Sequence, residues 1–301
     1  MRNVILAIGM FMIILVSVCA VNKDKITYYF IANSIEKKYG TTVENEYYLE
    51  DNFNFIDDYT DAKISSYRDM LNSIYYVINS GAIYSEKYCD QAYITCIEDL
   101  DKLVMDDELL STFNNFVHPY NSFETIVFSH DSNTFSMDIK HVYSDEDIQR
   151  LNNVVDSTVN KYITNTMSFK DKIRVIHDFI IDNTDYDTLK SNNINDNTYR
   201  SNTAYGVLLE NKGICSGYSD AMAIFLNKLN IINYKISNDE HIWNLVYLDG
   251  KWYHLDLTWD DPISDKNITR DNYFLITTEN LEYLNDKTHN FNKSIYTEAI
   301  E

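Results

Sequence analysis

Proline and glycine are scarce in this chain, with two prolines and seven glycines among 301 residues. Collagen-like, loop-rich and low-complexity chains contain far more of both, so those classes are excluded. Basic residues are also few, because 25 lysines and arginines stand against 46 acidic residues, for a formal net charge of −21. Phosphate backbones and anionic lipid surfaces would be repelled, so no nucleic acid partner is expected.

An uncharged and mostly apolar stretch covers residues 4–21, after Arg2 and before a polar chain. This pattern, with small residues near its end, is typical of a secretory signal peptide cleaved after Ala20. The stretch is also about long enough to span a bilayer, so a retained anchor in residues 1–21 is the alternative. A lipoprotein signal at Cys19 ranks last, because Val18 stands where such signals need a small residue. In each case residues 22–301 are expected outside the cytoplasm, with membrane contact only through the N-terminal segment.

Of the four cysteines, Cys19 would leave with a signal peptide. Cys89 and Cys96 are seven residues apart, and within one helix they would lie ~10 Å apart along the axis, too far for a disulfide. In a loop they could pair, but two buried thiols are the favoured interpretation. Cys215 has no evident partner, and an unpaired cysteine in an exported protein is a candidate reactive thiol.

Hydrophobic periodicity predicts several elements. A helix is expected over residues 64–78, and a pair of strands over 125–128 and 135–143. Two more helices should begin after Ser144 and Ser168, because each serine is followed three residues later by an aspartate, as in a capping box. Residues 183–202 are rich in Asn, Asp, Ser and Thr and predict a long loop. Its aspartates lack the glycine and closing glutamate of a calcium loop.

Three of the few glycines, Gly206, Gly213 and Gly217, cluster around Cys215. Behind them an apolar helical face begins, made of Tyr218, Ala221, Met222, Phe225, Leu226 and Leu229. Cys215 is therefore expected at a helix N-terminus, where the helix dipole and free N–H groups favour a thiolate and could hold an oxyanion. Taken alone, the same residue could equally be a small buried hydrophobe.

A second motif is a predicted hairpin, with strands over 241–248 and 251–259 joined by a two-residue turn at Asp249 and Gly250. In this register His241 and Asp256 are diagonal neighbours on one face, near enough for their side chains to meet. An aspartate on an imidazole fixes its tautomer, and such an imidazole can deprotonate a thiol. His254 is expected to be a bystander, because it faces Leu245. The seven histidines show no metal-ligand spacing, and no cofactor or metal is expected.

Four segments together resemble the transglutaminase-like superfamily in its bacterial form: residues 203–209 (TAYGVLL), 213–218 (GICSGY), 241–244 (HIWN) and 252–260 (WYHLDLTWD). Weaker likenesses are residues 176–180, which resemble the family's lead-in helix, and 273–275, which resemble its closing strand. The resemblance covers about residues 146–290. It implies an α+β, papain-like fold in which a nucleophile helix packs on an antiparallel sheet.

The resemblance also implies a catalytic triad of Cys215, His241 and Asp256 acting on amide bonds through a thioester. Tyr205 and Trp243 are the candidates for oxyanion-stabilising or supporting roles. The predicted organisation is a segment 1–21, a mixed α/β region 22–145 of unknown role, and a transglutaminase-like domain 146–301. The expected substrate is a protein or peptide, for example one of the cell surface or cell wall, and hydrolysis is favoured over transamidation. The alternative is a non-catalytic peptide- or wall-binding module on the same fold.

Overall fold

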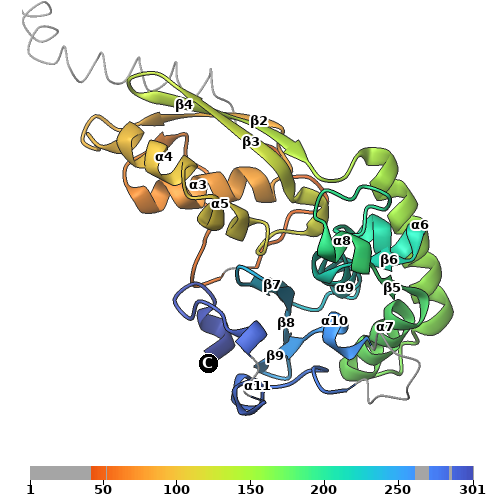
Figure 1. The fold of residues 1–301 in the computed structure, drawn as a ribbon. Helices are drawn as coiled ribbons and strands as arrows, with labels where there is room; N and C mark the ends of the chain where they lie inside the picture. Colours follow the sequence, from red (N-terminus) through yellow and green to blue (C-terminus); the bar gives the residue numbers. More distant parts are fainter. Residues whose placement is uncertain (1–41, 52, 262–270, 285–286, 301) are drawn as a thin grey trace, which may run out of the picture.

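The computed structural model describes residues 42–51, 53–261, 271–284 and 287–300. The predicted signal peptide or anchor, residues 1–21, lies outside this range. Among the residues described, no helix combines the length and apolarity needed to cross a bilayer. The described chain is an α+β protein with an N-terminal unit and a C-terminal core, and its elements follow the sequence from orange to blue in Figure 1.

The N-terminal unit packs three helices against one face of a four-stranded sheet (Figure 1). The sheet has the order β1-β2-β4-β3. The elements are β1 (Lys63–Ile64), α3 (Tyr67–Asn79), β2 (Tyr84–Cys89), α4 (Cys96–Val104), α5 (Asp107–Phe113), a 3-10 turn η1 (Pro119–Asn121), β3 (Phe123–His130) and β4 (Thr134–His141). The predicted strand pair is confirmed, because β3 and β4 are antiparallel neighbours. The predicted helix begins later than expected, because Ile64 belongs to β1 and Ser66 caps α3.

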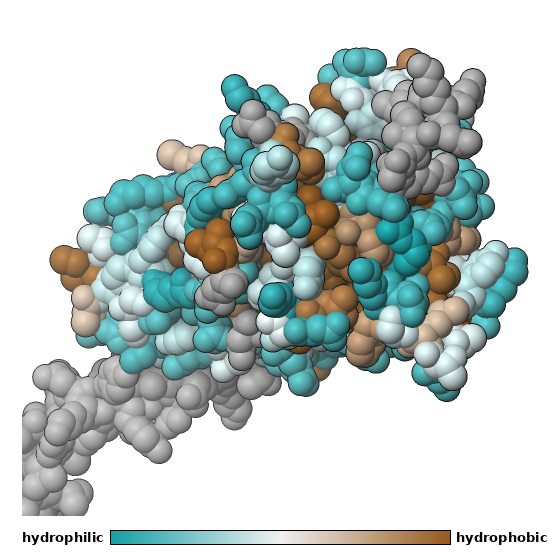
Figure 2. Space-filling view, turned by 90° about the horizontal axis from the view of Figure 1, so that it is seen from below, coloured by the Kyte–Doolittle hydropathy of each residue, from teal (hydrophilic) through white to brown (hydrophobic). Residues whose placement is uncertain are grey.

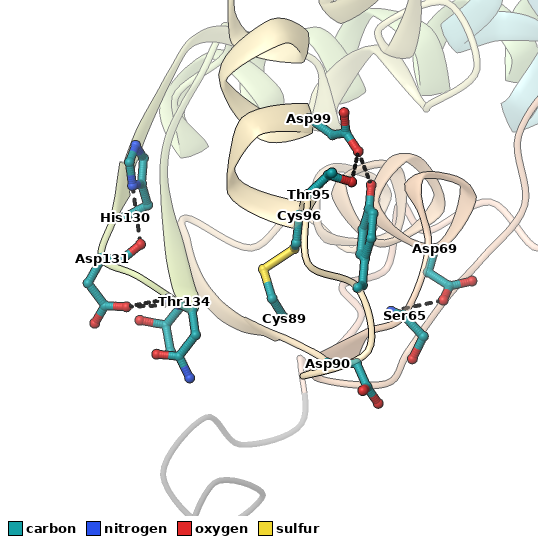
Figure 3. Close-up of a disulfide and its surroundings, with 12 residues drawn as sticks. Ser65, Asp69, Cys89, Asp90, Thr95, Cys96, Asp99, His130, Asp131 and Thr134 are labelled. Carbon is teal, nitrogen blue, oxygen red and sulfur yellow. Dashed lines mark hydrogen bonds between the residues drawn. A yellow bond between two sulfur atoms is a disulfide. The ribbon is translucent and has the colours of Figure 1, made fainter.

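The interpretation of Cys89 and Cys96 as two buried thiols is wrong, because they form a disulfide with their Cα atoms 6.0 Å apart. They do not share a helix. Cys89 ends β2 and Cys96 begins α4, and the turn between them folds back so that the sulfurs meet (Figure 3). Asp99 holds the same turn by accepting hydrogen bonds from the hydroxyls of Tyr93 and Thr95, at 2.9 and 2.8 Å. The disulfide therefore ties the sheet to the helical layer.

Two helices, α6 (Asp145–Tyr162) and α7 (Phe169–Asn183), open the C-terminal core at the predicted serines. Ser144 and Asp147 form the predicted capping box, and Ser168 caps α7. The following segment is not the long loop that its composition predicts. It contains β5 (Asp185–Tyr186) and α8 (Thr188–Asn192), because Asp187 caps α8 and β5 pairs with β6 (Lys212–Gly213).

The centre of the core is α9 (Cys215–Lys228), which packs on the antiparallel sheet β7-β8-β9. The strands are β7 (Asn233–Ser237), β8 (Ile242–Leu248) and β9 (Lys251–Leu255), and the hairpin has the predicted register, with Leu248 opposite Lys251. A π-helical turn η2 (Gly206–Glu210) precedes α9, and α10 (Leu257–Asp260), α11 (Thr278–Tyr283), η3 (Lys287–His289) and η4 (Thr297–Ile300) complete the described chain. In place of the expected closing strand near residue 274, a single bridge joins Ile276 to His254.

The sheet β7-β8-β9 is buried on both faces, and the two parts of the molecule pack against it from opposite sides. Val246, Leu248 and Leu255 face the cluster that contains α9. On the other face, Tyr234, Ile236, Trp243 and Leu245 join the cluster built by the N-terminal unit. The outer surface is mixed, and on the face seen in Figure 2 hydrophobic residues gather near the middle with hydrophilic ones around them.

Candidate active site

Cys215 is the first residue of α9, as the glycine cluster predicts, and it is a partly exposed free thiol. The chain enters the helix through Ile214, whose extended backbone donates its N–H to the carbonyl oxygen of Ser201 at 2.9 Å. Gly217 permits this close approach, because a Cβ there would lie 2.3 Å from that same oxygen. The sulfur therefore lies at the end of a long helix whose first-turn N–H groups have no intrahelical acceptor.

His241 lies just before β8, in a loop that is held by the side-chain oxygen and the side-chain NH₂ group of Asn238. The Asn238 side-chain oxygen accepts the N–H groups of Glu240 and His241, each at 2.9 Å. The Asn238 amide group donates to the carbonyl oxygens of Thr288 and Asn290 at 2.8 and 2.6 Å. The ring of His241 is thus fixed by a loop that is itself tied to the C-terminal segment.

Asp256 uses its two oxygens differently. Oδ2 bonds Nε2 of His241 at 2.5 Å, as the hairpin register predicts. Oδ1 accepts the N–H groups of Thr258 and Trp259 at 2.8 and 3.3 Å, which makes Asp256 the N-cap of α10. The predicted extension of the strand to residue 259 is therefore wrong, because the carboxylate turns the chain into a helix one residue after β9 ends.

The imidazole of His241 lies next to both of the other side chains, because it is hydrogen-bonded to Asp256 and is close enough to Cys215 for the thiol to raise its pKa. A carboxylate only accepts, so Nε2 carries a proton and Nδ1 is the nitrogen left for the thiol. Burial disfavours the charged ring, but the charge of Asp256, the hydrogen bond that its carboxylate accepts from the ring, and the interaction with Cys215 outweigh it and raise the pKa of His241 to about 10. Burial also opposes ionisation of Asp256, yet His241 and His289 hold the pKa of that carboxyl below its usual range.

His289, in η3, is part of this site and was not found from the sequence. Its Nε2 bonds the same Oδ2 of Asp256 at 2.8 Å, and the side chain is almost fully buried. The ring stacks on Tyr273 with centroids 4.7 Å apart. Nothing in the sequence marked this residue, because it lies 33 positions after Asp256 in a polar segment without periodicity.

The donor atoms of His241, Asp256 and His289 lie within 4.8 Å of one another, so these three residues could also ligate a metal. Their geometry is that of hydrogen bonding, because both histidines lie within 2.8 Å of one carboxylate oxygen. The scattered histidine positions in the sequence had indicated no such group. The fold brings two of them to one aspartate.

The two candidate supporting residues have different surroundings. Trp243 stacks on His241 with centroids 5.6 Å apart, and its indole N–H donates to Nδ1 of His254 at 2.9 Å. Tyr205 lies elsewhere: its hydroxyl bonds Arg150 and its ring lies under Arg200, and it does not line the cavity beside Cys215. No contact in the described structure supports an oxyanion role for Tyr205.

His254 faces Leu245, as predicted. It is buried between Trp243 and Thr278, whose hydroxyl lies 2.9 Å from Nε2. Burial lowers the pKa of His254 to about 3, with a smaller contribution from His289, so the ring stays neutral. His254 is therefore a packing residue that supports Trp243.

A cavity of about 400 Å³ opens on Cys215 and His241. One wall comes from the C-terminal core, including Asn202, Thr203 and Ser216. The facing wall belongs to the N-terminal unit and consists of Ser111, Asn114, Asn115, Ser122 and Val142. Asn115 fixes this wall to the core. Its side-chain amide donates to the hydroxyls of Ser237 and Tyr296 at 2.8 and 2.7 Å, and its backbone carbonyl accepts the N–H of Lys235. The N-terminal unit therefore shapes the space in front of the thiol.

Residues 156–257 match the family model described as the Transglutaminase-like superfamily, and this range contains Cys215, His241 and Asp256. The resemblance seen in the motifs is thus confirmed over that range. A solved structure described as "Crystal structure of a TGase" is similar at 18% identity with a TM-score of 0.34, over 50% of this chain and 47% of that one. This chain therefore spans about half the length of that structure. No curated protein matches the chain.

Proposed function

We propose that this chain, with its transglutaminase-like core, is an extracytoplasmic thiol enzyme that acts on amide or peptide bonds through a thioester at Cys215. The observation that carries the proposal is the position of His241, which is hydrogen-bonded to Asp256 and lines the same cavity as Cys215, close enough for the thiol to raise its pKa. A nucleophile beside a base, with the base oriented by a third group, is the arrangement that activates a thiol.

In the acylation step, the Cys215 thiolate forms a C–S bond to the substrate carbonyl carbon. The negative charge that moves to the carbonyl oxygen is stabilised by the free N–H groups at the N-terminus of α9. The C–N bond then breaks, and His241 donates its Nδ1 proton to the leaving amine. Asp256 keeps the ring in the tautomer that this transfer requires.

In the second step, His241 accepts a proton from water, the water oxygen attacks the thioester, and the C–S bond breaks to release an acid. An amine in place of water would give transamidation. We favour hydrolysis because Cys215 is partly exposed at an open cavity, so water reaches the thioester. Enzymes that transfer acyl groups to other acceptors need to exclude water.

Two features support an extracytoplasmic location. Disulfides persist in oxidising compartments, and Cys89 is joined to Cys96. The N-terminal apolar stretch is typical of an exported chain. A protein or peptide of the cell surface or cell wall is the partner that fits such a location.

A screen of labelled peptides, with and without a labelled amine, tests the proposal. Peptide cleavage alone would support hydrolysis, and incorporation of the amine would redirect it to transamidation. Cys215→Ala removes one partly exposed sulfur, so it should abolish turnover and leave the melting temperature nearly unchanged. Wild-type turnover by this variant would overturn the proposed nucleophile. Binding of a peptide without turnover by the wild type would favour a binding module instead.

A further inference from the structure

The cavity at Cys215 continues into a longer groove. A second cavity, of about 490 Å³, shares four lining residues with the first: Ser111, Ser237, Asn238 and Asp239. It extends to Asp107 and Glu108, in the first turn of α5. The two cavities are thus adjacent parts of one groove, which runs from the thiol along the edge of the N-terminal unit.

The charge along this groove has one sign. Four exposed carboxylates line it: Asp107, Glu108, Asp239 and Glu240. Besides His241, the only cation among the described lining residues is Lys235, which is buried and bonded to Asp220 at 2.6 Å. Asp220 is in turn held by the hydroxyl of Tyr143 at 2.8 Å. The charge of Lys235 is therefore balanced by Asp220 in the floor of the cavity, and the four exposed carboxylates are left to face a ligand.

A second observation independently points to a ligand in the same place. Ser122 lines the cavity at Cys215 and is only 3% exposed, yet its hydroxyl has no hydrogen-bond partner in the described part of the chain. Buried polar groups are nearly always paired, so an unpaired one beside a cavity indicates a missing polar partner. The hydroxyl oxygen itself has almost no exposed surface, so an amide of a bound peptide would reach it only after the Ser122 side chain rotates toward the cavity.

We propose that this groove binds a positively charged peptide segment, rich in lysine or arginine, and delivers its neighbouring carbonyl to Cys215. This inference rests on the proposed function and adds the substrate class. Asp239 and Glu240 adjoin His241 in the chain and would contact the residues nearest the reacting bond. Asp107 and Glu108 would contact residues farther along the same peptide.

Iodoacetyl peptides test the inference without a known substrate, because they alkylate Cys215 at a rate that depends on how the peptide binds. The probes are iodoacetyl-trilysine, iodoacetyl-triserine and iodoacetyl-triglutamate, used at low ionic strength. Wild type should react fastest with trilysine and slowest with triglutamate. The preference should shrink as salt shortens the Debye length.

The double variant Asp239→Asn, Glu240→Gln should lower the trilysine preference by roughly two- to fivefold for each carboxylate removed, the range expected for exposed ion pairs. Asp138→Asn, Asp249→Asn is the matched control, since it makes the same change in net charge at exposed positions outside the groove. The control should keep the wild-type preference. Equal loss in both double variants would show that the overall charge of −21 is responsible and would overturn the groove.

Asp107→Asn, Glu108→Gln separates the far end of the groove from the near end. It should lower the rate with trilysine but leave unchanged the rate with 2-aminoethyl methanethiosulfonate, a cationic reagent too short to extend from Cys215 into the second cavity, which Asp107 and Glu108 line. Reaction of all three peptides at one rate, with Cys215 still reactive to iodoacetamide, would overturn the groove alone. Failure of folded Cys215 to react with iodoacetamide faster than free cysteine would instead refute the proposed function, and this inference with it.

Discussion

At the residue scale, Asp256 divides its carboxylate between two tasks. Oδ1 caps α10, and Oδ2 receives hydrogen bonds from both His241 and His289. The side chain is buried, so each of these partners offsets part of the cost of removing a charge from water. A change at this residue can therefore affect the fold and the chemistry separately.

Asp256→Asn should separate those two effects. Asparagine is a good N-cap, so its oxygen can still accept from Thr258 and Trp259, and the melting temperature should fall only modestly. Its amide group would donate to Nε2 of His241 and move the ring proton to Nδ1, which is the wrong tautomer. We expect turnover to fall by roughly 10³–10⁴-fold, as in serine protease triads. Steady-state kinetics with a validated peptide measures this, and a variant with more than a tenth of wild-type activity would contradict the assigned role.

His289 is a positioning residue in this account, because it acts through Asp256, to which it is hydrogen-bonded at 2.8 Å. His289→Phe keeps an aromatic ring against Tyr273 but removes the donor to Oδ2, whereas His289→Gln keeps a donor and loses the ring. Hydrogen bonds to charged groups contribute about 1.5–3 kcal/mol, so alkylation of Cys215 at pH 6 should slow by roughly tenfold or more in His289→Phe. His289→Gln should recover part of that rate. Equal pH–rate profiles for wild type and both variants would show that the histidine serves packing alone.

At the scale of elements, the disulfide joins β2 to α4 across a short turn. Loop-closure entropy gives about 2–3 kcal/mol for a crosslink of this span. The double variant Cys89→Ser, Cys96→Ser should lose about that much free energy of unfolding in denaturant titrations. Cys215 should keep its reactivity, because it lies in the other part of the molecule. In protein produced without residues 1–21, three titratable thiols in the native, unreduced state, in place of Cys215 alone, would contradict the crosslink.

Local signals in the sequence predicted the elements that local interactions determine. The capping box at Ser144 and the turn at Asp249 and Gly250 are complete within a few residues, and the structure has both as predicted. The end of β9 was missed because it depends on the capping by Asp256, which strand periodicity does not reveal. The link between Cys89 and Cys96 was missed because it depends on how a strand, a turn and a helix pack.

The candidate site divides in the same way. The contact of His241 with Asp256 followed from counting residues across one hairpin. His289 reaches the site through the packing of the C-terminal segment, and Asn115 and Ser122 reach it from the N-terminal unit. No sequence pattern reports contacts over such separations, so the cavity walls could be seen only in the fold.

At the scale of the whole molecule, the two parts share one hydrophobic cluster. Phe116 is fully buried, with its ring 4.9 Å from Tyr234 of the core and 5.3 Å from Phe53 of the N-terminal unit. Phe116→Ala should cost about 3–5 kcal/mol and lower the stability of both parts together. Thermal unfolding followed by far-UV circular dichroism and by tryptophan fluorescence should give coincident transitions. Since all three tryptophans lie in the core, separate transitions would show that the parts fold independently.

The central claim is that His241 holds Cys215 as an activated thiolate. The most direct measurement is the rate of iodoacetamide labelling of Cys215 between pH 5.5 and 9.5, read by intact mass. With the pKa of His241 raised to about 10, the imidazolium persists across this range, so labelling should already be fast near pH 6 and nearly level up to pH 9. In His241→Gln the labelling rate should instead depend on pH as for a free thiol, with a midpoint at about pH 8.5. A wild-type profile that matches His241→Gln would contradict the account.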